Sequence, residues 1–391
     1  MSKSLQGTVS LPGSKSESNR ALMVAAYGGF LLEAEGLSDA HDTVLLQKLL
    51  RQVNVTASEG PVSVDCEDAG TVARFMMTYL ACKQGTWLLR GTERMCQRPM
   101  AALIEALRQL GGDLECVGEK GSLPVRITGV PIQGGSLEID ASDSSQFVSS
   151  LLLAAPMWPE GLQLKLTGEL NSLSYIDMTL AVMRHFGADA ERDGRSIIVK
   201  PKPYESRIFV VSKDWSSASY WYEMMALSDK GNLLLKGLKK DTLQGDAVVA
   251  DWFKSFGVMT SFEEDGARLT KKNGTDTVDF QELIFDFTNI PDLFPTVFVT
   301  CKALQRQAVF RGVSTLHAKE SDRIATLHAE LSRISDFDHS ASGIVFRTYR
   351  DHRIAMALAS LWPLLGPVTV DDPSVVGKSY PGFWEELIRL S

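Results

Sequence analysis

Hydrophobic and polar positions follow one pattern that returns six times along the chain. In each copy, a first helical turn of small polar or charged residues leads into an apolar body rich in alanine and methionine, so we expect a buried helix. These predicted helices begin near Ser16, Gly70, Ser144, Ser216, Pro291 and Asp351. Six copies in 391 residues give an average period of about 65 residues, which is typical of a repeat architecture.

A second, amphipathic helix follows each buried one, because apolar residues recur there at helical spacing. These segments are 42–52, 98–112, 176–188, 245–258, 321–334 and 381–390. Several end in glycine and lead into a pair of alternating strands, as at 187–199 and 257–269. We therefore predict an α/β protein of two domains, with three repeats in each and the apolar helices inside. The six polar helix starts would then face one cleft, where helix dipoles favour an anion.

The first of these helix starts has the chemistry of an anion site. The segment Ser14-Lys15-Ser16, with Arg20 one turn later, adds hydroxyls and two cations to the unpaired backbone N–H groups of a helix end. For this segment alone, a capped helix with two solvated cations is the better explanation. A nucleotide-binding P-loop is excluded, because Ser14 separates Gly13 from Lys15 and breaks the required spacing.

The composition limits the partners and cofactors that we expect. A net charge of −8 leaves no global basic surface for nucleic acid. Five cysteines without a CxxC pair and six scattered histidines indicate neither a disulfide framework nor a metal site. The N-terminus has no apolar signal core. The longest uncharged run, 354–370, is broken by two prolines and a glycine, so we expect no membrane span and a cytoplasmic protein.

Ten short motifs connect the chain to a known family. They are LPGSKSESNRAL, DAGTVARF, RMCQRPM, SDSSQF, SYIDMTL, QGD, NIPD, KESDR, YRDHRIAMA and GKSYPGFW, in this order and across essentially the whole chain. Together they resemble the 5-enolpyruvylshikimate-3-phosphate synthase (EPSP synthase, 3-phosphoshikimate 1-carboxyvinyltransferase) family of enolpyruvyl transferases. The resemblance implies a two-domain inverse α/β barrel of six βαβαββ-type repeats, three per domain, with the active site in the interdomain cleft.

The resemblance also implies how the chain is divided and what it does. One domain would comprise 1–13 and 214–391 and the other 14–213, with hinge crossings near 13–14 and 213–214 and closure on binding. The family transfers the enolpyruvyl group of phosphoenolpyruvate to the 5-hydroxyl of shikimate 3-phosphate and releases phosphate, in the shikimate pathway to chorismate and the aromatic amino acids. It needs no metal or organic cofactor, and we expect a monomer.

The matched motifs assign candidate binding residues. By resemblance, the phosphoenolpyruvate contacts are Lys15, Gly70, Arg98, Gln146, Arg323, Arg353 and Lys378. By resemblance, the shikimate 3-phosphate contacts are Lys15, Ser16, Arg20, Ser144, Ser145, Gln146, Ser172, Tyr175, Asp292 and Lys319. The two substrates together carry about four anionic groups, and planar guanidinium groups bind phosphate and carboxylate well.

The reaction requires two proton transfers, for which two carboxylates are suitable. The 5-hydroxyl loses a proton as it attacks C2 of phosphoenolpyruvate, and C3 gains one. By resemblance, Asp292 lies next to the 5-hydroxyl, Glu320 carries the proton at C3, and Lys15 shares one of these roles. A helix N-cap after Pro291 is a second explanation of Asp292, and the two are compatible.

Some positions depart from the family pattern and keep alternatives open. Asp68 and Thr315 stand where asparagine is frequent, and a non-catalytic relative that only binds shikimate 3-phosphate would explain them. The UDP-N-acetylglucosamine enolpyruvyl transferase is a second alternative. That enzyme has a cysteine five residues before its Arg-Pro, whereas Cys96 is two residues before Arg98. Gly70 matches the small position linked to glyphosate sensitivity, so we expect inhibition by glyphosate.

Overall fold

The computed structural model describes residues 4–55, 60–271, 282–334, 337 and 343–390. Its contacts divide the chain into two compact units. Unit 1 contains the described residues of 1–14, 38–41 and 212–391, and unit 2 contains those of 15–37 and 42–211. The predicted crossings at 13–14 and 213–214 lie within two residues of these divisions. The assignment of 38–41 to unit 1 has no counterpart in the sequence pattern.

Unit 2 is built around three apolar helices that pack against one another. They are α1 (Lys15–Gly28), α3 (Gly70–Cys82) and α6 (Ser145–Ala154). The helices α2 (His41–Val55), α4 (Glu93–Cys96), α5 (Ala101–Gln109), α7 (Leu173–His185) and the 3-10 turn η1 (Ala155–Met157) complete its helical part. The three buried helices of this half and their amphipathic partners are therefore confirmed.

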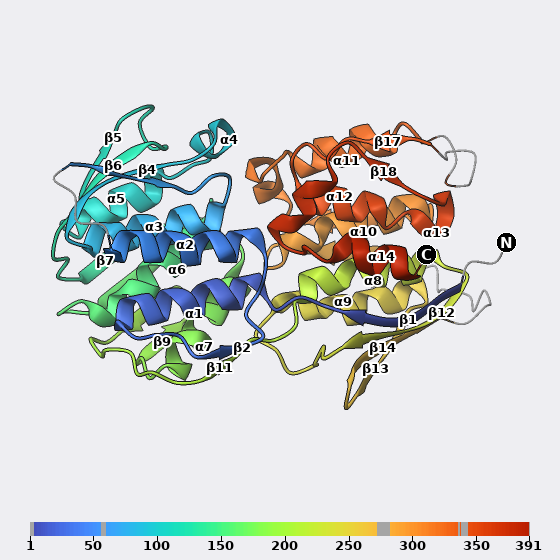
Figure 1. Ribbon diagram of the computed structural model, residues 1–391, viewed down its shortest axis with the longest axis horizontal. Coiled ribbons are helices and arrows are strands. Elements are labelled where there is room, and N and C mark those ends of the chain that lie inside the picture. Colours follow the sequence, from blue (N-terminus) through green and yellow to red (C-terminus); the bar gives the residue numbers. More distant parts are fainter. Residues whose placement is uncertain (1–3, 56–59, 272–281, 335–336, 338–342, 391) are drawn as a thin grey trace. The chain divides into compact units, whose positions relative to one another are not determined.

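Three sheets belong to unit 2 (Figure 1). Two of them have the orders β3-β4-β6-β5 and β7-β8-β10-β9, and the third is the pair β11-β2. The strands are β2 (Ala34–Glu35), β3 (Val62–Asp65), β4 (Gly85–Arg90), β5 (Asp113–Cys116), β6 (Val125–Gly129), β7 (Gly135–Asp140), β8 (Leu162–Thr167), β9 (Ala190–Asp193), β10 (Ser196–Val199) and β11 (Phe209–Val210). The predicted strand pair at 187–199 is confirmed as β9 and β10.

Unit 1 repeats this plan with its own core. Its central helices α8 (Trp215–Leu227), α10 (Phe294–Ala303) and α12 (His352–Ala359) pack together, and every residue of α8 and α12 is buried. Further helices are α11 (Arg323–Leu331), α13 (Trp362–Leu365) and α14 (Phe383–Leu390). Its 3-10 turns include η4 (Pro291–Leu293), η5 (Ser314–Ala318) and η7 (Pro373–Lys378).

The prediction of one α-helix over 245–258 is wrong. This segment is a 3-10 turn η2 (Gly245–Val248), one α-helical turn α9 (Val249–Trp252) and a second 3-10 turn η3 (Phe253–Phe256). Six of its fourteen residues are valine, phenylalanine or tryptophan, which favour a helix less than leucine or alanine does. Tight turns still bury Val249, Phe253 and Phe256 in the core of unit 1, so the hydrophobic pattern survives while the helix type changes.

The sheets of unit 1 are β1-β12-β14-β13, β15-β16 and β17-β18. Their strands are β1 (Ser4–Ser10), β12 (Lys230–Lys236), β13 (Met259–Glu263), β14 (Gly266–Lys271), β15 (Leu283–Asp286), β16 (Ala308–Arg311), β17 (Val345–Phe346) and β18 (Thr369–Val370). β13 and β14 confirm the predicted strand pair near 257–269. Each described sheet of the two units contains one parallel pair, and three of them add an antiparallel hairpin.

The two chain segments at the predicted crossings are hydrogen-bonded side by side. Gly13 and Lys213 form an antiparallel bridge. The Ser14 amide donates to the Ser212 carbonyl across 2.8 Å, and the Asp214 amide donates to the carbonyl of Pro12 across 3.1 Å. The chain therefore enters and leaves the segment that contains unit 2 through two neighbouring, hydrogen-bonded segments.

Candidate functional site

Lys15 is the first residue of α1, and its ammonium group is held by a buried carboxylate. The Lys15 Nζ atom lies 3.0 Å from Oδ2 of Asp42, and the two side chains are 14% and 2% exposed. Asp42 lies in the first turn of α2, where a carboxylate also interacts favourably with the helix dipole. The sequence predicted Lys15 but not its partner. Asp42 is the first residue of the predicted helix DTVLLQKLLRQ, and this position at a helix start is the only signal in the sequence that could have pointed to a functional role for it.

Arg20 connects three helices of unit 2. Its guanidinium group donates to Oγ1 of Thr179 (2.7 Å), to Oγ of Ser149 (3.3 Å) and to the carbonyls of Ser16 and Tyr175 (2.9 and 3.1 Å). Arg20 is 2% exposed, and burial lowers the pKa of its guanidinium to about 10. Arg20, a predicted substrate contact, thus also links α1, α6 and α7 through buried hydrogen bonds.

The glycine at the start of α3 makes room for two guanidinium groups. A Cβ atom on Gly70 would lie 2.6 Å from Nη1 of Arg74 and would also overlap the guanidinium of Arg98. Arg74 donates to the carbonyl of Gly70 across 3.0 Å, and Arg98 is 8% exposed. The amide of Gln146, at the start of α6, donates to Thr71 across 3.0 Å. The structure therefore brings Gly70, Arg98 and Gln146 to the adjoining ends of α3 and α6.

Hydroxyl groups surround the starts of α6 and α7. Ser144 caps α6, because its Oγ atom accepts a hydrogen bond from the backbone N–H of Gln146 across 3.2 Å. Ser145, the first residue of α6, is buried. Ser172 precedes α7 with a left-handed φ of 60°. The Tyr175 ring centroid lies 5.9 Å from Cζ of Arg20, a cation–π distance. Hydroxyls and Arg20 thus occur together, as the prediction of a shikimate 3-phosphate site requires.

Unit 1 holds the predicted carboxylates around one arginine. The Arg323 guanidinium donates from Nη1 to Asp292 (3.0 Å), from Nη2 to Glu320 (3.0 Å) and from Nε to Asp351 (2.9 Å). Arg323 is 1% exposed and Asp351 is fully buried. Burial acts to lower the pKa of Arg323, but the three carboxylates outweigh it and raise the pKa above its usual value. Arg323 is therefore a permanent cation that holds Asp292 and Glu320 at a common point.

A second arginine binds the other oxygen of Asp292. Arg353 Nη2 lies 2.7 Å from Oδ2 of Asp292, and its Nη1 lies 3.5 Å from the Tyr220 hydroxyl. Neither η4 nor α10 has a side-chain cap hydrogen bond at its start, so the alternative of Asp292 as an N-cap is wrong. Its side chain binds Arg323 and Arg353 instead.

Asp351 is a functional candidate that the sequence analysis missed. Its Oδ1 atom caps α12 by accepting from the Arg353 amide (3.0 Å), and its Oδ2 atom accepts from Ser321 and Arg323 (3.1 and 2.9 Å). Asp351 thereby binds the backbone of Arg353 and the side chain of Arg323. The matched motif YRDHRIAMA contains Asp351. An aspartate that caps a helix is so common that the motif alone could not show that Asp351 also binds Arg323.

The remaining predicted cations of unit 1 are placed on neighbouring segments. Lys378 ends η7 and is 6% exposed, and η7 packs against α12, where Arg353 lies in the first turn. Lys319 follows η5 and directly precedes Glu320. Unit 1 thus contains Asp292, Glu320, Arg323, Arg353, Lys319 and Lys378, while the other predicted site residues belong to unit 2.

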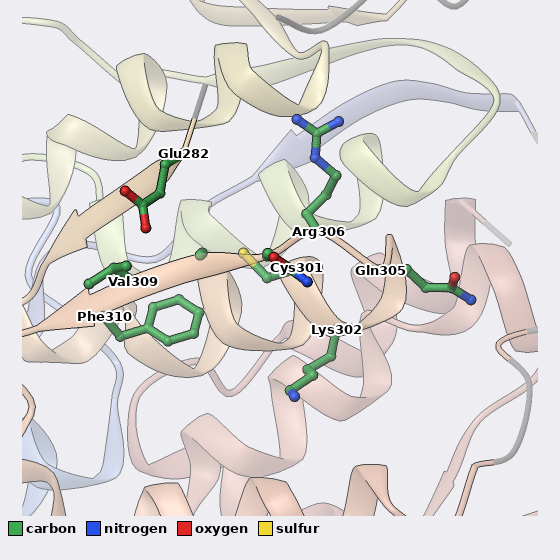
Figure 2. A pocket seen from close by; sticks show the side chains of 9 residues that line it. Glu282, Cys301, Lys302, Gln305, Arg306, Val309 and Phe310 are labelled. Carbon is green, nitrogen blue, oxygen red and sulfur yellow. The ribbon is translucent and has the colours of Figure 1, made fainter. Parts of the chain in front are cut away.

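A large surface pocket of unit 1 does not contain this cluster. Its volume is about 1160 Å³, and Figure 2 shows Glu282, Lys302, Gln305 and Arg306 around it. It lies at the C-terminal end of α10, whereas Asp292 lies just before the N-terminal end of that helix. Ten helical residues span about 15 Å, and none of the lining residues is a predicted site residue. Charge chemistry, not cavity size, identifies the candidate site.

The described part of the chain shows no arrangement for a metal ion and no helix that could span a membrane. No group of three or more His, Cys, Asp and Glu side chains is suitably clustered in it. None of its helices combines the length and the apolar character that a bilayer requires. The five cysteines are free, and Cys96 is half-buried, with Sγ 3.7 Å from the Gly91 carbonyl.

Solved structures define the class of protein to which this fold belongs. The chain is similar to EPSP synthase from Acinetobacter baumannii, with a TM-score of 0.76 and 22% identity over 100% of this chain and 97% of that one. It is also similar to the enolpyruvyl transferase NikO from Streptomyces tendae, with a TM-score of 0.70 and 16% identity over 99% and 95%. The mixed α/β fold is thus that of the enolpyruvyl transferases.

Sequence comparison identifies the family within this class. The EPSP synthase (3-phosphoshikimate 1-carboxyvinyltransferase) family model matches residues 1–387. The 3-phosphoshikimate 1-carboxyvinyltransferase of Bacteroides fragilis (strain YCH46) is 40% identical over 98% of this chain and 95% of its own length. That of Vibrio cholerae (strain M66-2) is 31% identical over 99% and 97%. The chain belongs to the EPSP synthase family, which removes the support for the UDP-N-acetylglucosamine alternative.

Proposed function

We propose that Asp292, Glu320 and Lys15 move the protons of an enolpyruvyl transfer. As a member of the EPSP synthase family, the chain is a 3-phosphoshikimate 1-carboxyvinyltransferase. It transfers the enolpyruvyl group of phosphoenolpyruvate to the 5-hydroxyl of shikimate 3-phosphate and releases phosphate, in the shikimate pathway. What remains to be assigned is the work of individual residues.

The carboxylates act as acid and base. Asp292, with Lys15 sharing the transfer, accepts the proton of the 5-hydroxyl as its oxygen bonds to C2 of phosphoenolpyruvate. Glu320 delivers a proton to C3, and a tetrahedral ketal phosphate forms. The phosphate then leaves and takes up the proton held by Asp292, while the C3 proton returns to Glu320, which gives the enol ether and inorganic phosphate. The single observation that carries this proposal is the Arg323 guanidinium, which lies 3.0 Å from both Asp292 and Glu320.

The cations bind the substrate anions. Phosphoenolpyruvate is held by Lys15, Gly70, Arg98, Gln146, Arg323, Arg353 and Lys378. Shikimate 3-phosphate is held by Lys15, Ser16, Arg20, Ser144, Ser145, Gln146, Ser172, Tyr175, Asp292 and Lys319. Arg323 and Arg353 already bind Asp292, so an incoming phosphate or carboxylate would share these two guanidinium groups with that carboxylate.

The architecture supports the same proposal. The parallel pair in every described sheet, with one inner helix for each, is what six βαβαββ-type repeats would produce. We propose that they form an inverse α/β barrel, with 1–13 and 214–391 as one domain and 14–213 as the other. The substrates would complete the site in a cleft between them, with the paired segments at Gly13 and Lys213 as the hinge. We also propose that the protein is a cytoplasmic monomer, that it binds neither nucleic acid nor a membrane, and that it needs no cofactor.

Release of inorganic phosphate tests the assignment. The protein is expected to release phosphate only when both phosphoenolpyruvate and shikimate 3-phosphate are present. Asp292→Ala and Glu320→Ala are each expected to slow release by at least about a thousandfold, or roughly 4 kcal/mol of barrier. Glu385→Ala, which removes an exposed carboxylate of α14, is the matched control and should keep the parental rate.

Two results would contradict the proposal in different ways. Binding of shikimate 3-phosphate without phosphate release by the parental protein would favour the non-catalytic relative, with Asp68 and Thr315 as the first positions to restore to asparagine. Full activity of both alanine variants would instead leave the reaction intact and remove the proton-transfer roles.

A further inference from the structure

The QGD motif at 244–246 has no role in the reaction proposed above, yet it holds the start of α8. Gln244 accepts from the Trp215 amide across 2.7 Å and donates to the Lys213 carbonyl across 2.9 Å. Asp246 follows in η2, is 4% exposed and accepts a hydrogen bond from the Ser216 hydroxyl. A buried carboxyl group is thus fixed to the first turn of a central helix.

One face of α8 places this carboxyl group beside the Asp292–Arg353 pair. Ser216 and Tyr220 are four residues apart, so their side chains lie on the same helix face in successive turns. Ser216 binds Asp246, and the Tyr220 hydroxyl lies 3.5 Å from Nη1 of Arg353. The other end of the same guanidinium binds Asp292 across 2.7 Å. Asp246 is therefore bound to α8 one helical turn from Tyr220, the residue of this helix that contacts Arg353.

We infer that Asp246 is a positioning residue for the enolpyruvyl transfer, because its charge sets how firmly Arg353 is held and how well Arg353 binds phosphoenolpyruvate. The inference rests on the proposed function. The charged groups that act on Asp246 are Asp292 from η4, Arg353 from α12 and Asp214 from the cap of α8.

The charge of Asp246 changes close to neutral pH. Burial, followed by the negative charge of Asp292, raises the pKa of Asp246 to about 7, and the Ser216 hydroxyl and Arg353 act in the opposite direction. Below this pH, Asp246 is neutral, and Asp292 is the carboxylate that binds Arg353 across 2.7 Å. Above it, the negative charge of Asp246 offsets part of the positive charge of Arg353, so the affinity for phosphoenolpyruvate falls.

The pH dependence of the KM for phosphoenolpyruvate tests this inference. In the parental enzyme, the KM is expected to rise by about tenfold more between pH 6 and pH 8.5 than in Asp246→Asn, which cannot ionise. The kcat profiles of the two proteins should differ much less. The ionisation of the substrates is common to both and cancels in the comparison. Asp251→Asn is the matched control, because Asp251 is an exposed aspartate in the same segment, and it should keep the parental profile.

Ser216→Ala supplies a second, signed expectation that does not depend on how well Asp246→Asn folds. The hydroxyl stabilises the ionised carboxylate, so its removal should move the midpoint of the KM profile to higher pH. An unchanged midpoint in Ser216→Ala, or an Asp246→Asn profile parallel to that of the parental enzyme, would overturn the inference. Absence of turnover in the parental protein at every pH would instead overturn the proposed function.

Discussion

Arg323 donates to Asp292 across 3.0 Å while the same guanidinium also reaches Glu320 and the fully buried Asp351. Arg323→Gln leaves all three carboxylates without this cation. Removing one partner of a buried ion pair costs about 3–5 kcal/mol, so we expect the free energy of unfolding to fall by about this amount. Urea unfolding at pH 7 measures it. Arg268→Gln, at a partly exposed arginine paired with Glu263, should leave the urea midpoint unchanged.

A carboxylate cluster without its arginine should also respond to acid. Protonation relieves the repulsion among Asp292, Glu320 and Asp351, so the stability deficit of Arg323→Gln should shrink as the pH falls from 7 to 5. A deficit that is the same at both pH values would mean that Arg323 acts through packing rather than through charge.

Gly70→Ala is expected to weaken binding rather than folding. The added methyl group would meet the guanidinium groups of Arg74 and Arg98, which are the movable ends of long side chains. Displacement of Arg98 should raise the KM for phosphoenolpyruvate by about tenfold, or roughly 1.4 kcal/mol of binding energy. The inhibition by glyphosate that the family resemblance predicts should weaken by at least as much. Steady-state kinetics with and without glyphosate measure both effects.

The control for this substitution is Gly382→Ala, because a Cβ atom there meets nothing within 4 Å. Its KM and its sensitivity to glyphosate should match those of the parental protein. If Gly70→Ala also matched them, the close approach of the arginines to α3 would have no part in substrate binding.

Glu223 is expected to make the stability of unit 1 depend on pH. Its side chain in α8 is fully buried, neither oxygen has a hydrogen-bond partner in the described part of the chain, and burial raises its pKa well above the usual value. The folded protein therefore keeps a proton that the unfolded chain loses above about pH 4.5. Its free energy of unfolding should fall by up to about 1.4 kcal/mol per pH unit above that value.

Glu223→Gln removes this dependence, because an amide does not ionise. The variant should be more stable than the parental protein at pH 8 and should approach it near pH 4.5, as measured by urea unfolding at several pH values. Glu385→Gln, at an exposed site in α14, is the matched control. Parallel pH profiles for the parental protein and Glu223→Gln would show that Glu223 is ionised in the folded state.

Arg20→Lys should separate the structural from the binding role of this residue. Lysine keeps the charge but cannot reach Thr179, Ser149 and the Tyr175 carbonyl together. Each unsatisfied buried acceptor costs about 1–3 kcal/mol, so the variant should lose about 2–4 kcal/mol of unfolding free energy. Calorimetric titration with shikimate 3-phosphate then reports binding by the folded fraction. The exposed Arg126→Lys should change neither quantity.

The helices could be predicted from local hydrophobic patterns, and the candidate site residues could be named from short motifs, because both signals depend on neighbouring residues. The apolar bodies of α3 and α8 can only be buried, and the strand pair β9–β10 follows from alternation and a turn at Gly194. The segment 245–258 differed, because its hydrophobic positions fit both an α-helix and a series of tight turns. Periodicity reports which side chains are buried more reliably than it reports the backbone that buries them.

Long-range pairing accounts for what the sequence could not predict at the site. The motifs named Arg323 and Asp292 for substrate contacts and catalysis, but their mutual ion pair joins segments that are distant in the sequence. Asp42 and Asp351 resemble ordinary residues of helix starts, and only the fold places them against Lys15 and Arg323. Such contacts require three-dimensional information, because aspartate is also common at helix starts as an ordinary N-cap residue.

The parallel pairing of β1 with β12 has a consequence for synthesis on the ribosome. Ser4 pairs with Lys230, and all of unit 2 is encoded between them. β1 is translated before unit 2 and must therefore wait, without β12, until the whole of unit 2 and α8 have been translated. Unit 2 has its own core and can collapse during this interval, whereas unit 1 cannot close its first sheet until later. The exposed edge of the nascent β1 is thus the segment that we expect chaperones to protect.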